Sequence, residues 1–259
     1  MNASDFDADV LVVGGGVAGL TAATFTARAG LDTLVLHDGE SILRRNAHLE
    51  NVPGFPAGVN PRLYADLLEE QAERNGVTIE SGRVERVVST ASGFRVSTAA
   101  GDSFDARYVV AASWSDASYL PEDVAVRARG SKTFVDEDGV GRTSVAGLYA
   151  TGRLADTYHQ AVVAAGHGAE VGITLVHDSN TPFYNDWVTP EGYFTDRGRD
   201  VPPGCEEIDA EEQARRQVES RAVMREQFAE PHEQRQRTHP SLVDDDRGRV
   251  DPSWDVTDG

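Results

Sequence analysis

The sequence is poor in cysteine, and this scarcity excludes two kinds of chemistry. Its 259 residues include a single cysteine, Cys205, which follows Pro-Pro-Gly and precedes Glu206 and Glu207. One thiol can form neither an internal disulfide nor a Cys-x-x-Cys redox pair. The two neighbouring carboxylates also disfavour the thiolate form of Cys205. We therefore expect Cys205 to be an incidental loop residue.

Lysine is almost absent, whereas acidic residues are in large excess. Lys132 is the only lysine among 24 basic residues, and 43 acidic residues give the chain a formal net charge of −19. Such a surface suits a salt-rich cytoplasm in which ions screen self-repulsion, and an acidic protein of an ordinary cell is the alternative. Because nucleic acids and anionic lipids repel this charge, we expect neither a nucleic-acid partner nor a membrane partner.

Long apolar runs and metal-binding spacings are also missing. No run of about 18 apolar residues occurs, so the sequence predicts no membrane-spanning helix. The first seven residues, Met-Asn-Ala-Ser-Asp-Phe-Asp, are acidic, whereas a secretory signal begins with basic residues, and we expect a cytoplasmic protein. The seven histidines show neither His-x-His nor His-x-x-x-His spacing and have no cysteine partner, so we expect no metal site.

The most informative feature present is an apolar strand that runs into a glycine-rich turn. Residues 10–13 are apolar, Gly14-x-Gly16-x-x-Gly19 follows, and a second apolar run at residues 33–36 arrives at βαβ spacing. Gly14 permits the tight turn, Gly16 lets the backbone approach a pyrophosphate, and Gly19 lets the following helix pack closely. The pattern predicts dinucleotide binding, with a turn that merely packs as the alternative.

The same turn opens a helix, and this has an electrostatic consequence. Free N–H groups at Val17 and Ala18 would lie at the positive end of the helix dipole, where phosphates bind readily. We therefore place these two residues in the predicted cofactor site.

The rest of the chain divides at about residue 178. Residues 1–178 predict one α/β domain, and residues 179–259 predict an acidic, partly helical extension that is disordered from residue 231 onward. Aromatic residues at positions 183–194 would either dock this extension on the core or cover a cofactor. The expected helices are 61–76, 160–176 and 208–230, and the expected strands are 77–79, 84–88, 94–98, 103–110 and 147–150.

Three segments resemble the FAD-binding half of thioredoxin-reductase-like flavoproteins. They are residues 14–23 (GGGVAGLTAA), residues 49–56 (LENVPGFP) and residues 143–169, which contain TSVAGLYATG, DTYHQA and AAGHGA. The resemblance covers residues 8–178 and implies a Rossmann-type three-layer α/β fold. A central parallel sheet would carry helices on one side and a small antiparallel sheet on the other. Self-association as a homodimer is a further implication, because related flavin domains pair.

The resemblance also implies which residues hold FAD. Asn51 would face the flavin or its ribityl chain, although Asn51 could also belong to a simple turn. Backbone N–H groups of Gln160 and Ala161 would stabilise negative charge on the flavin, with helix capping by Gln160 as the alternative. The segment that begins at Gly152 would follow the ribityl chain, and Val84 would present its backbone to the adenine.

Three departures from the family pattern concern the cofactor site. His37 and Asp38 stand where a ribose-binding acid is expected. Arg153 replaces the acid of the family's Gly-Asp pair and would either bind a phosphate or point into solvent. The segment Ala111-Ala112-Ser113 stands where the family tends to have Ala-Thr-Gly.

A fourth departure concerns electron supply. The family inserts an NADPH domain at a point where residues 112–143 leave only about thirty residues, far fewer than the ~100 of a typical domain. The sequence therefore predicts an FAD-binding oxidoreductase that takes electrons from an unidentified external donor. A non-catalytic flavin- or nucleotide-binding protein with a regulatory or assembly role is the alternative.

Two histidines and an arginine pair lie close to the predicted flavin loops. His48 and His159 are candidate acid–base groups, because histidine titrates near neutral pH, with an exposed or structural role as the alternative for each. The pair Arg44-Arg45 would attract an anionic substrate, cover the flavin or form an ordinary solvated basic pair.

Overall fold

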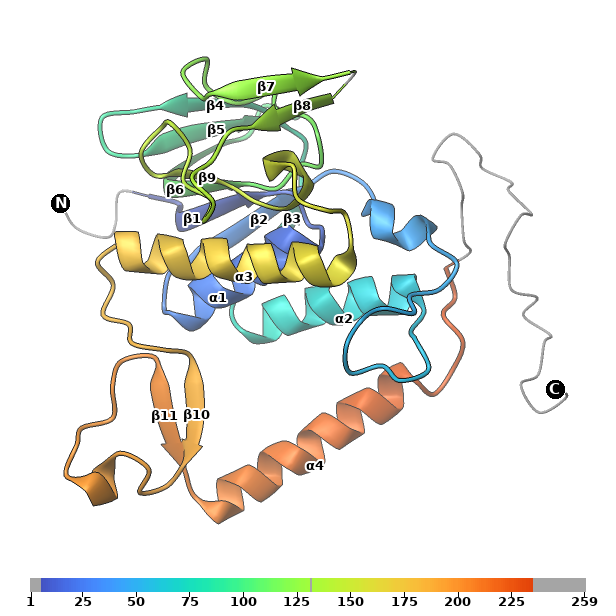
Figure 1. Ribbon diagram of the computed structural model, residues 1–259, viewed down its shortest axis with the longest axis vertical. Coiled ribbons are helices and arrows are strands. Elements are labelled where there is room, and N and C mark those ends of the chain that lie inside the picture. The colour runs from blue at the N-terminus through green and yellow to red at the C-terminus, as the bar shows by residue number, and fades with distance from the viewer. Residues whose placement is uncertain (1–5, 131, 235–259) are drawn as a thin grey trace, which may run out of the picture.

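A seven-stranded sheet forms the centre of the protein (Figure 1). The computed structural model describes residues 6–130 and 132–234. The strand order is β3-β2-β1-β6-β5-β4, and β9 pairs with β6. The parallel strands are β1 (Ala8–Val13), β2 (Thr33–His37), β3 (Thr78–Ser81), β6 (Ser103–Ala111) and β9 (Leu148–Ala150), and the antiparallel strands are β4 (Val84–Ser89) and β5 (Phe94–Thr98).

Strand β6 connects the parallel and antiparallel parts of this sheet. Its last six residues pair with β1, whereas on its other side Ser103–Ala106 pair antiparallel with β5 and Val109–Ala111 pair parallel with β9. The Rossmann-type α/β fold is confirmed. The antiparallel strands β4 and β5 join the central sheet through β6, and they pack on its other face as expected, where Val87 and Val96 share one apolar cluster with Leu11. A separate two-stranded hairpin, β7 (Val126–Arg129) and β8 (Lys132–Val135), lies above them in the view of Figure 1.

Helices cover the opposite face of the sheet. Helices α1 (Val17–Arg28), α2 (Pro61–Arg74) and α3 (Ala161–Asp178) lie together below the strands in Figure 1. Helices α1 and α3 pack closely because α3 carries glycine where a β-carbon would meet the backbone of α1. A β-carbon on Gly168 would lie 2.3 Å from the carbonyl oxygen of Ala18, and one on Gly172 would lie 2.9 Å from that of Ala22.

The sequence predicted these helices and the flanking turns because their signals are local. Asn60 caps α2 by accepting the backbone N–H of Arg62, and Pro61 occupies the first turn, where its missing N–H costs nothing. Most buried residues of β1, β2 and β6 are apolar, since helices cover one face of the sheet and the antiparallel strands cover the other. Short 3-10 helices follow β2 and β9, at η1 (Ile42–Arg45) and η2 (Gly152–Ala155).

The C-terminal extension packs against the helical side of the sheet domain. It contains a parallel strand pair, β10 (Trp187–Pro190) and β11 (Cys205–Ile208), linked through η3 (Thr195–Arg197), and then α4 (Ala210–Gln227). No residue of α4 is buried, as its thin apolar stripe predicted. Cys205, expected in a loop, is the first residue of β11. The division at residue 178 stays a prediction.

Two predictions about the extension concern its aromatic residues and the end of the chain. The aromatic rings of Trp187, Tyr193 and Phe194 contact one another, and Phe183 packs on the helical core. Disorder from residue 231 stays a prediction: His232 and Gln234 make the contacts described below, and residues 235–259 lie outside the described residues. Within the described part of the chain, no helix is long and apolar enough to cross a bilayer.

Candidate functional site

The predicted cofactor residues gather at the carboxyl edge of the parallel strands. Strands β1, β2, β6 and β9 run in the same direction and therefore end at the same edge. The residues that directly follow these four strands are Gly14, Asp38, Ala112 and Thr151. Ligands of open α/β sheets bind outside this edge, so the fold brings the predicted residues to the expected place.

The three glycines of the first turn differ in the space and the backbone conformation at their positions. Gly14 has φ +117°, and a β-carbon there would lie 2.6 Å from the carbonyl oxygen of Ala112. A β-carbon on Gly19 would lie 2.0 Å from the carbonyl oxygen of Gly14. Gly16 is extended at φ −89°, and its β-carbon would meet only Ser41 Oγ at 3.7 Å. Neither conformation nor packing requires glycine at position 16, so the open space beside it fits a ligand that approaches the backbone.

The start of α1 offers unneutralised positive charge to such a ligand. Gly16 caps the helix without any side-chain hydrogen bond, and the first turn contains no acidic residue. Val17 and Ala18 are buried in the packing of this turn. The N-terminal N–H groups and the helix dipole are thus left for an anion, which is the arrangement that binds a pyrophosphate.

The end of β2 lies beside the start of β4. The ring of His37 would lie 3.1 Å from a β-carbon on Gly15, and its Nδ1 is 3.3 Å from the carbonyl oxygen of Gly39. The Gly82 N–H donates to the carbonyl oxygen of His37 at 2.8 Å, which brings Val84 to the same edge. The Asp38 carboxylate lies 3.7 Å from Arg83 Nη1, in an exposed ion pair.

Asn51 and Gln160, 109 residues apart, form a direct hydrogen bond. Asn51 Nδ2 donates to Gln160 Oε1 at 2.7 Å. Gln160 occupies the N-cap position of α3, as the helix-capping alternative expects, but its side chain makes no capping hydrogen bond. The Gln160 N–H donates to the carbonyl oxygen of Tyr158 at 2.9 Å, which leaves Ala161 as the free donor of the predicted pair.

Unpartnered polar atoms concentrate in the segment after β9. Four buried side-chain atoms of the described residues have no hydrogen-bond partner, and three of them are Thr151 Oγ1, Arg153 Nε and Thr157 Oγ1. A buried polar group without a partner is costly, so such a cluster needs an explanation. A polar ligand that runs along residues 151–157 would supply the missing partners.

Arg153 does not point into solvent. Its Nη1 donates to Asp156 Oδ1 and to the carbonyl oxygen of Thr157, both at 3.1 Å, and its guanidinium carbon lies 4.8 Å from the Phe134 ring centroid. Burial raises the pKa of Asp156, but the contacts with Arg127, Arg129 and Arg153 outweigh it, and the pKa is lowered overall. The solvent alternative for Arg153 is therefore wrong, and a phosphate would have to compete with Asp156.

The altered segment Ala111-Ala112-Ser113 is held by internal contacts. Ala111 ends β6, the Ala112 carbonyl packs against Gly14, and Ser113 Oγ donates to the carbonyl oxygen of Asp116 and contacts the Tyr119 hydroxyl, both at 2.7 Å. These contacts fix the altered Ala-Ala-Ser segment as a loop anchor.

The two candidate histidines contact different partners. His48 Nδ1 lies 2.8 Å from Glu50 Oε1, whereas the His159 ring contacts the Trp114 ring with centroids 5.4 Å apart. No cluster of three metal-ligating side chains is found among residues 6–130 and 132–234.

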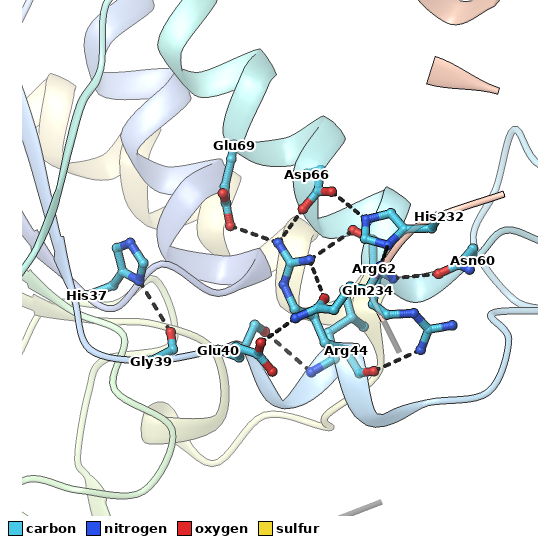
Figure 2. Close-up of polar contacts among 12 residues, drawn as sticks. His37, Gly39, Glu40, Arg44, Asn60, Arg62, Asp66, Glu69, His232 and Gln234 are labelled. Atoms are coloured by element: carbon cyan, nitrogen blue, oxygen red, sulfur yellow. Dashed lines mark hydrogen bonds and ion pairs between the residues drawn. The ribbon is translucent and has the colours of Figure 1, made fainter. Parts of the chain in front are cut away.

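A polar network around Arg44 was missed by the sequence prediction. Figure 2 shows Arg44 between α2 and the C-terminal segment, where it donates to Asp66, Glu69 and Gln234. Burial lowers the pKa of Arg44, but the two carboxylates outweigh this effect and raise it. With only 13% of its side chain exposed, Arg44 is not half of an ordinary solvated basic pair.

The C-terminal segment completes this network. His232 Nε2 lies 2.6 Å from Asp66 Oδ2, and Gln234 also donates to Glu40, on the loop that begins at Asp38 (Figure 2). The extension therefore contacts the loop beside the predicted ribose position, through Gln234 and Glu40. Only proximity in space reveals this relationship, since the partners are 166 and 194 residues apart.

Comparisons with known proteins agree with the geometry. The family model for pyridine nucleotide-disulphide oxidoreductases matches residues 8–168, more than half of the chain. The thioredoxin reductase of Rickettsia conorii is 34% identical over 113 residues, which cover 43% of this chain and 36% of that protein. The bifunctional thioredoxin reductase/thioredoxin of Mycobacterium leprae is 35% identical over 136 residues, covering 51% and 30%.

Solved structures support the fold. A thioredoxin reductase from Gloeobacter violaceus superposes with a TM-score of 0.60 at 20% identity, over 71% of this chain and 99% of that one. The thioredoxin reductase of T. acidophilum superposes with a TM-score of 0.56 at 17% identity, over 66% of this chain and 98% of that one. The matched stretches span about a third of the length of the curated relatives. The chain belongs to the pyridine nucleotide-disulphide oxidoreductase family and is similar to the thioredoxin reductases within it.

Proposed function

We propose that this chain binds FAD and acts as an oxidoreductase whose electrons come from an external donor. The observation that carries the proposal is the convergence at one sheet edge of an open glycine turn, the Asn51–Gln160 bond and the unpartnered atoms of residues 151–157. Each of these features suits a different part of an elongated, polar dinucleotide.

The residues present fit the parts of FAD. Gly16, Val17 and Ala18 would bind the pyrophosphate through backbone N–H groups. Asp38 would accept a hydrogen bond from a ribose hydroxyl. Asn51 would orient the ring system, and Ala161 would direct its N–H toward the charge that reduction creates. When bound, FAD supplies reversible uptake of one or two electrons, which no side chain of the protein can supply.

The proposal of an external donor rests on two features. Between β6 and β9 the described chain holds a short hairpin, β7–β8, in the interval where the resemblance implies an inserted NADPH domain. The single cysteine, Cys205, lies on β11, beyond the opposite end of α3 from Gln160. We therefore propose that neither a dithiol relay nor a family-type nicotinamide site operates in this chain.

A spectroscopic experiment tests both parts of the proposal. The protein is purified in high KCl with added FAD, its visible spectrum is recorded, and it is then mixed anaerobically with NADPH or with dithionite. We expect a flavin spectrum that dithionite bleaches and NADPH does not. Rapid bleaching by NADPH contradicts the external donor, and a colourless protein contradicts FAD binding.

A non-catalytic role is the second candidate, and Arg153 favours it. The Arg153 guanidinium is already paired with Asp156, in a segment where the family places a carboxylate near the cofactor. A protein that melts cooperatively and binds FAD or another nucleotide, but accepts no electrons from dithionite at its bound cofactor, would support a regulatory or assembly role.

A further inference from the structure

The β7–β8 hairpin and the neighbouring segment η2 concentrate positive charge in a strongly acidic chain. Two carboxylates, Asp136 and Asp156, are paired within this group. The cations are Arg127, Arg129, Lys132 and Arg153. The group holds four cations and two carboxylates in a protein whose net charge is −19, and the next two acids, Glu137 and Asp138, bind backbone N–H groups and Arg142. The group is therefore an exception to the surface that surrounds it.

Two of these cations remain available to a ligand. Lys132 Nζ lies 6.0 Å from the Trp114 ring centroid, and no carboxylate partner for it is found in the part of the chain that the structure describes. Arg129 donates one Nη2 bond to Asp156 at 2.7 Å, while 64% of its side chain is exposed. An anion that reached Lys132 and Arg129 would meet two donors and would compete with Asp156 for Arg129.

Aromatic rings lie beside the cations. The Trp114 ring contacts the His159 ring, with centroids 5.4 Å apart, and Lys132 lies over the Trp114 ring. Cations next to an indole offer a ligand both charge pairing and a surface for stacking. This combination suits a molecule that has a negatively charged group on a planar ring.

The backbone at this place is strained. Trp114 has φ +57° and Asp156 has φ +59°, and they are two of the three non-glycine residues with positive φ in the described chain. Such conformations persist only where surrounding contacts fix them, and they concentrate at functional sites. Asp156 is fixed by three arginines, and Trp114 follows the loop that Ser113 anchors.

The group borders the proposed cofactor site. Trp114 comes two residues after Ala112, whose carbonyl packs against Gly14, and His159 directly precedes Gln160, which binds Asn51. The group also lies against η2, because β8 contacts this helix and Arg127 and Arg129 pair with Asp156 at its end. A ligand held here would lie next to the ring system that Asn51 and Ala161 are proposed to hold.

We propose that Lys132, Arg129, Trp114 and His159 form a binding site for a small aromatic anion, the substrate class of the proposed flavin enzyme. Lys132 and Arg129 bind the carboxylate or an equivalent anionic group, and Trp114 and His159 contact the ring. The inference rests on the proposed function for the identity of the ligand as a substrate. Binding itself can be measured without electron transfer.

Titration calorimetry of the full-length, FAD-supplemented protein tests the site, with 2-naphthoate as the probe. Naphthalene-2-methanol keeps the ring without the charge, and acetate keeps the charge without the ring. We expect 2-naphthoate to bind, both control molecules to bind at least about tenfold more weakly, and Lys132→Gln to weaken 2-naphthoate about tenfold. Quenching of Trp114 fluorescence in a Trp187→Phe/Trp254→Phe background then locates the probe.

Arg197→Gln is the matched control. Arg197 also lies over an aromatic ring, 4.3 Å from the Tyr193 centroid, but it belongs to the extension far from the sheet edge. It should leave the affinity for 2-naphthoate unchanged. Equal affinities of wild type and Lys132→Gln, or equal binding of acetate, overturn the inference. If the protein binds FAD but not 2-naphthoate, only the proposed anion site is overturned. If it binds 2-naphthoate but not FAD, only the proposed function is overturned.

Discussion

The backbone N–H of Gly152 donates to His167 Nδ1 at 3.1 Å, so an imidazole of α3 holds the first residue of η2. The bond requires an unprotonated Nδ1, and His167 must therefore be neutral with its proton on Nε2. Burial lowers the pKa of His167 from its ordinary value of 6.5, against a smaller opposite effect of Glu137 and Glu170. The geometry and the titration of His167 thus favour the same neutral form.

A pH dependence of stability follows from this shift. Since the folded pKa lies below 6.5, the unfolded chain takes up a proton first as the pH falls, and the free energy of unfolding should decrease from about pH 6.5 down to the folded pKa. The stability is fully present above pH 6.5. Urea denaturation of wild type and His167→Gln across this range should show the component in the wild type only.

His177→Gln on the same helix is the control for this experiment. His177 contacts the Phe183 ring and not Gly152, so the variant should keep the wild-type pH profile. Parallel profiles for wild type and His167→Gln would show that His167 does not contribute.

Two variants in the first glycine turn test ligand binding and packing separately. Gly16→Ala places its β-carbon in open space at an ordinary φ of −89°, so the free energy of unfolding should change by less than about 0.5 kcal/mol, while FAD affinity falls at least about tenfold. Gly19→Ala forces a β-carbon to 2.0 Å from the Gly14 carbonyl and should cost about 2–3 kcal/mol. Denaturation and FAD titration of both variants measure the two effects. Unchanged FAD affinity in a folded Gly16→Ala protein would contradict the proposed pyrophosphate position.

Helix α3 provides a second matched pair, Gly168 and Gly166. Gly168→Ala would bring a β-carbon to 2.3 Å from the Ala18 carbonyl, so it should separate α1 from α3 and cost about 1–3 kcal/mol. Gly166 has no atom within 4 Å of its β-carbon position, and Gly166→Ala should raise stability by about 0.5–1 kcal/mol through helix propensity. Chemical denaturation distinguishes the opposite signs, and equal losses in both variants would show that helix contact is not the cause.

Local patterns made much of the fold predictable. Patterns of a few residues predict β1 from its apolar residues, the first turn from its glycines and the start of α2 from Pro61. The hairpin β7–β8 was missed because its strands have four residues each and β7 is exposed at every position, which leaves no alternation to detect. The parallel pair β10–β11 was missed because its strands are equally short and lie fifteen positions apart in the sequence.

Contacts between distant residues explain what was missed in the site. The sequence proposed Asn51 and Gln160 separately, but no spacing rule predicts that their side chains bond. Arg153 was interpreted by itself, whereas Asp156 and two hairpin arginines determine where it points. For Arg44, a solvated pair was one of three alternatives, and no local pattern predicts its contact with Gln234, which is 190 residues away.

The Asn51–Gln160 bond allows the proposed flavin site to be tested by a double-mutant cycle. Asn51→Ala and Gln160→Ala each remove one side of a 2.7 Å bond between exposed side chains, so neither should change stability appreciably. If the bond orients both groups toward FAD, each variant should weaken FAD binding about tenfold, and the double variant should show a coupling of about 0.5–1.5 kcal/mol. Fluorescence titration with FAD gives the four affinities, and Gln217→Ala on the exposed helix α4 is the control. Strictly additive losses would mean that the two side chains contact FAD independently, and four equal affinities would place the ring system away from this pair.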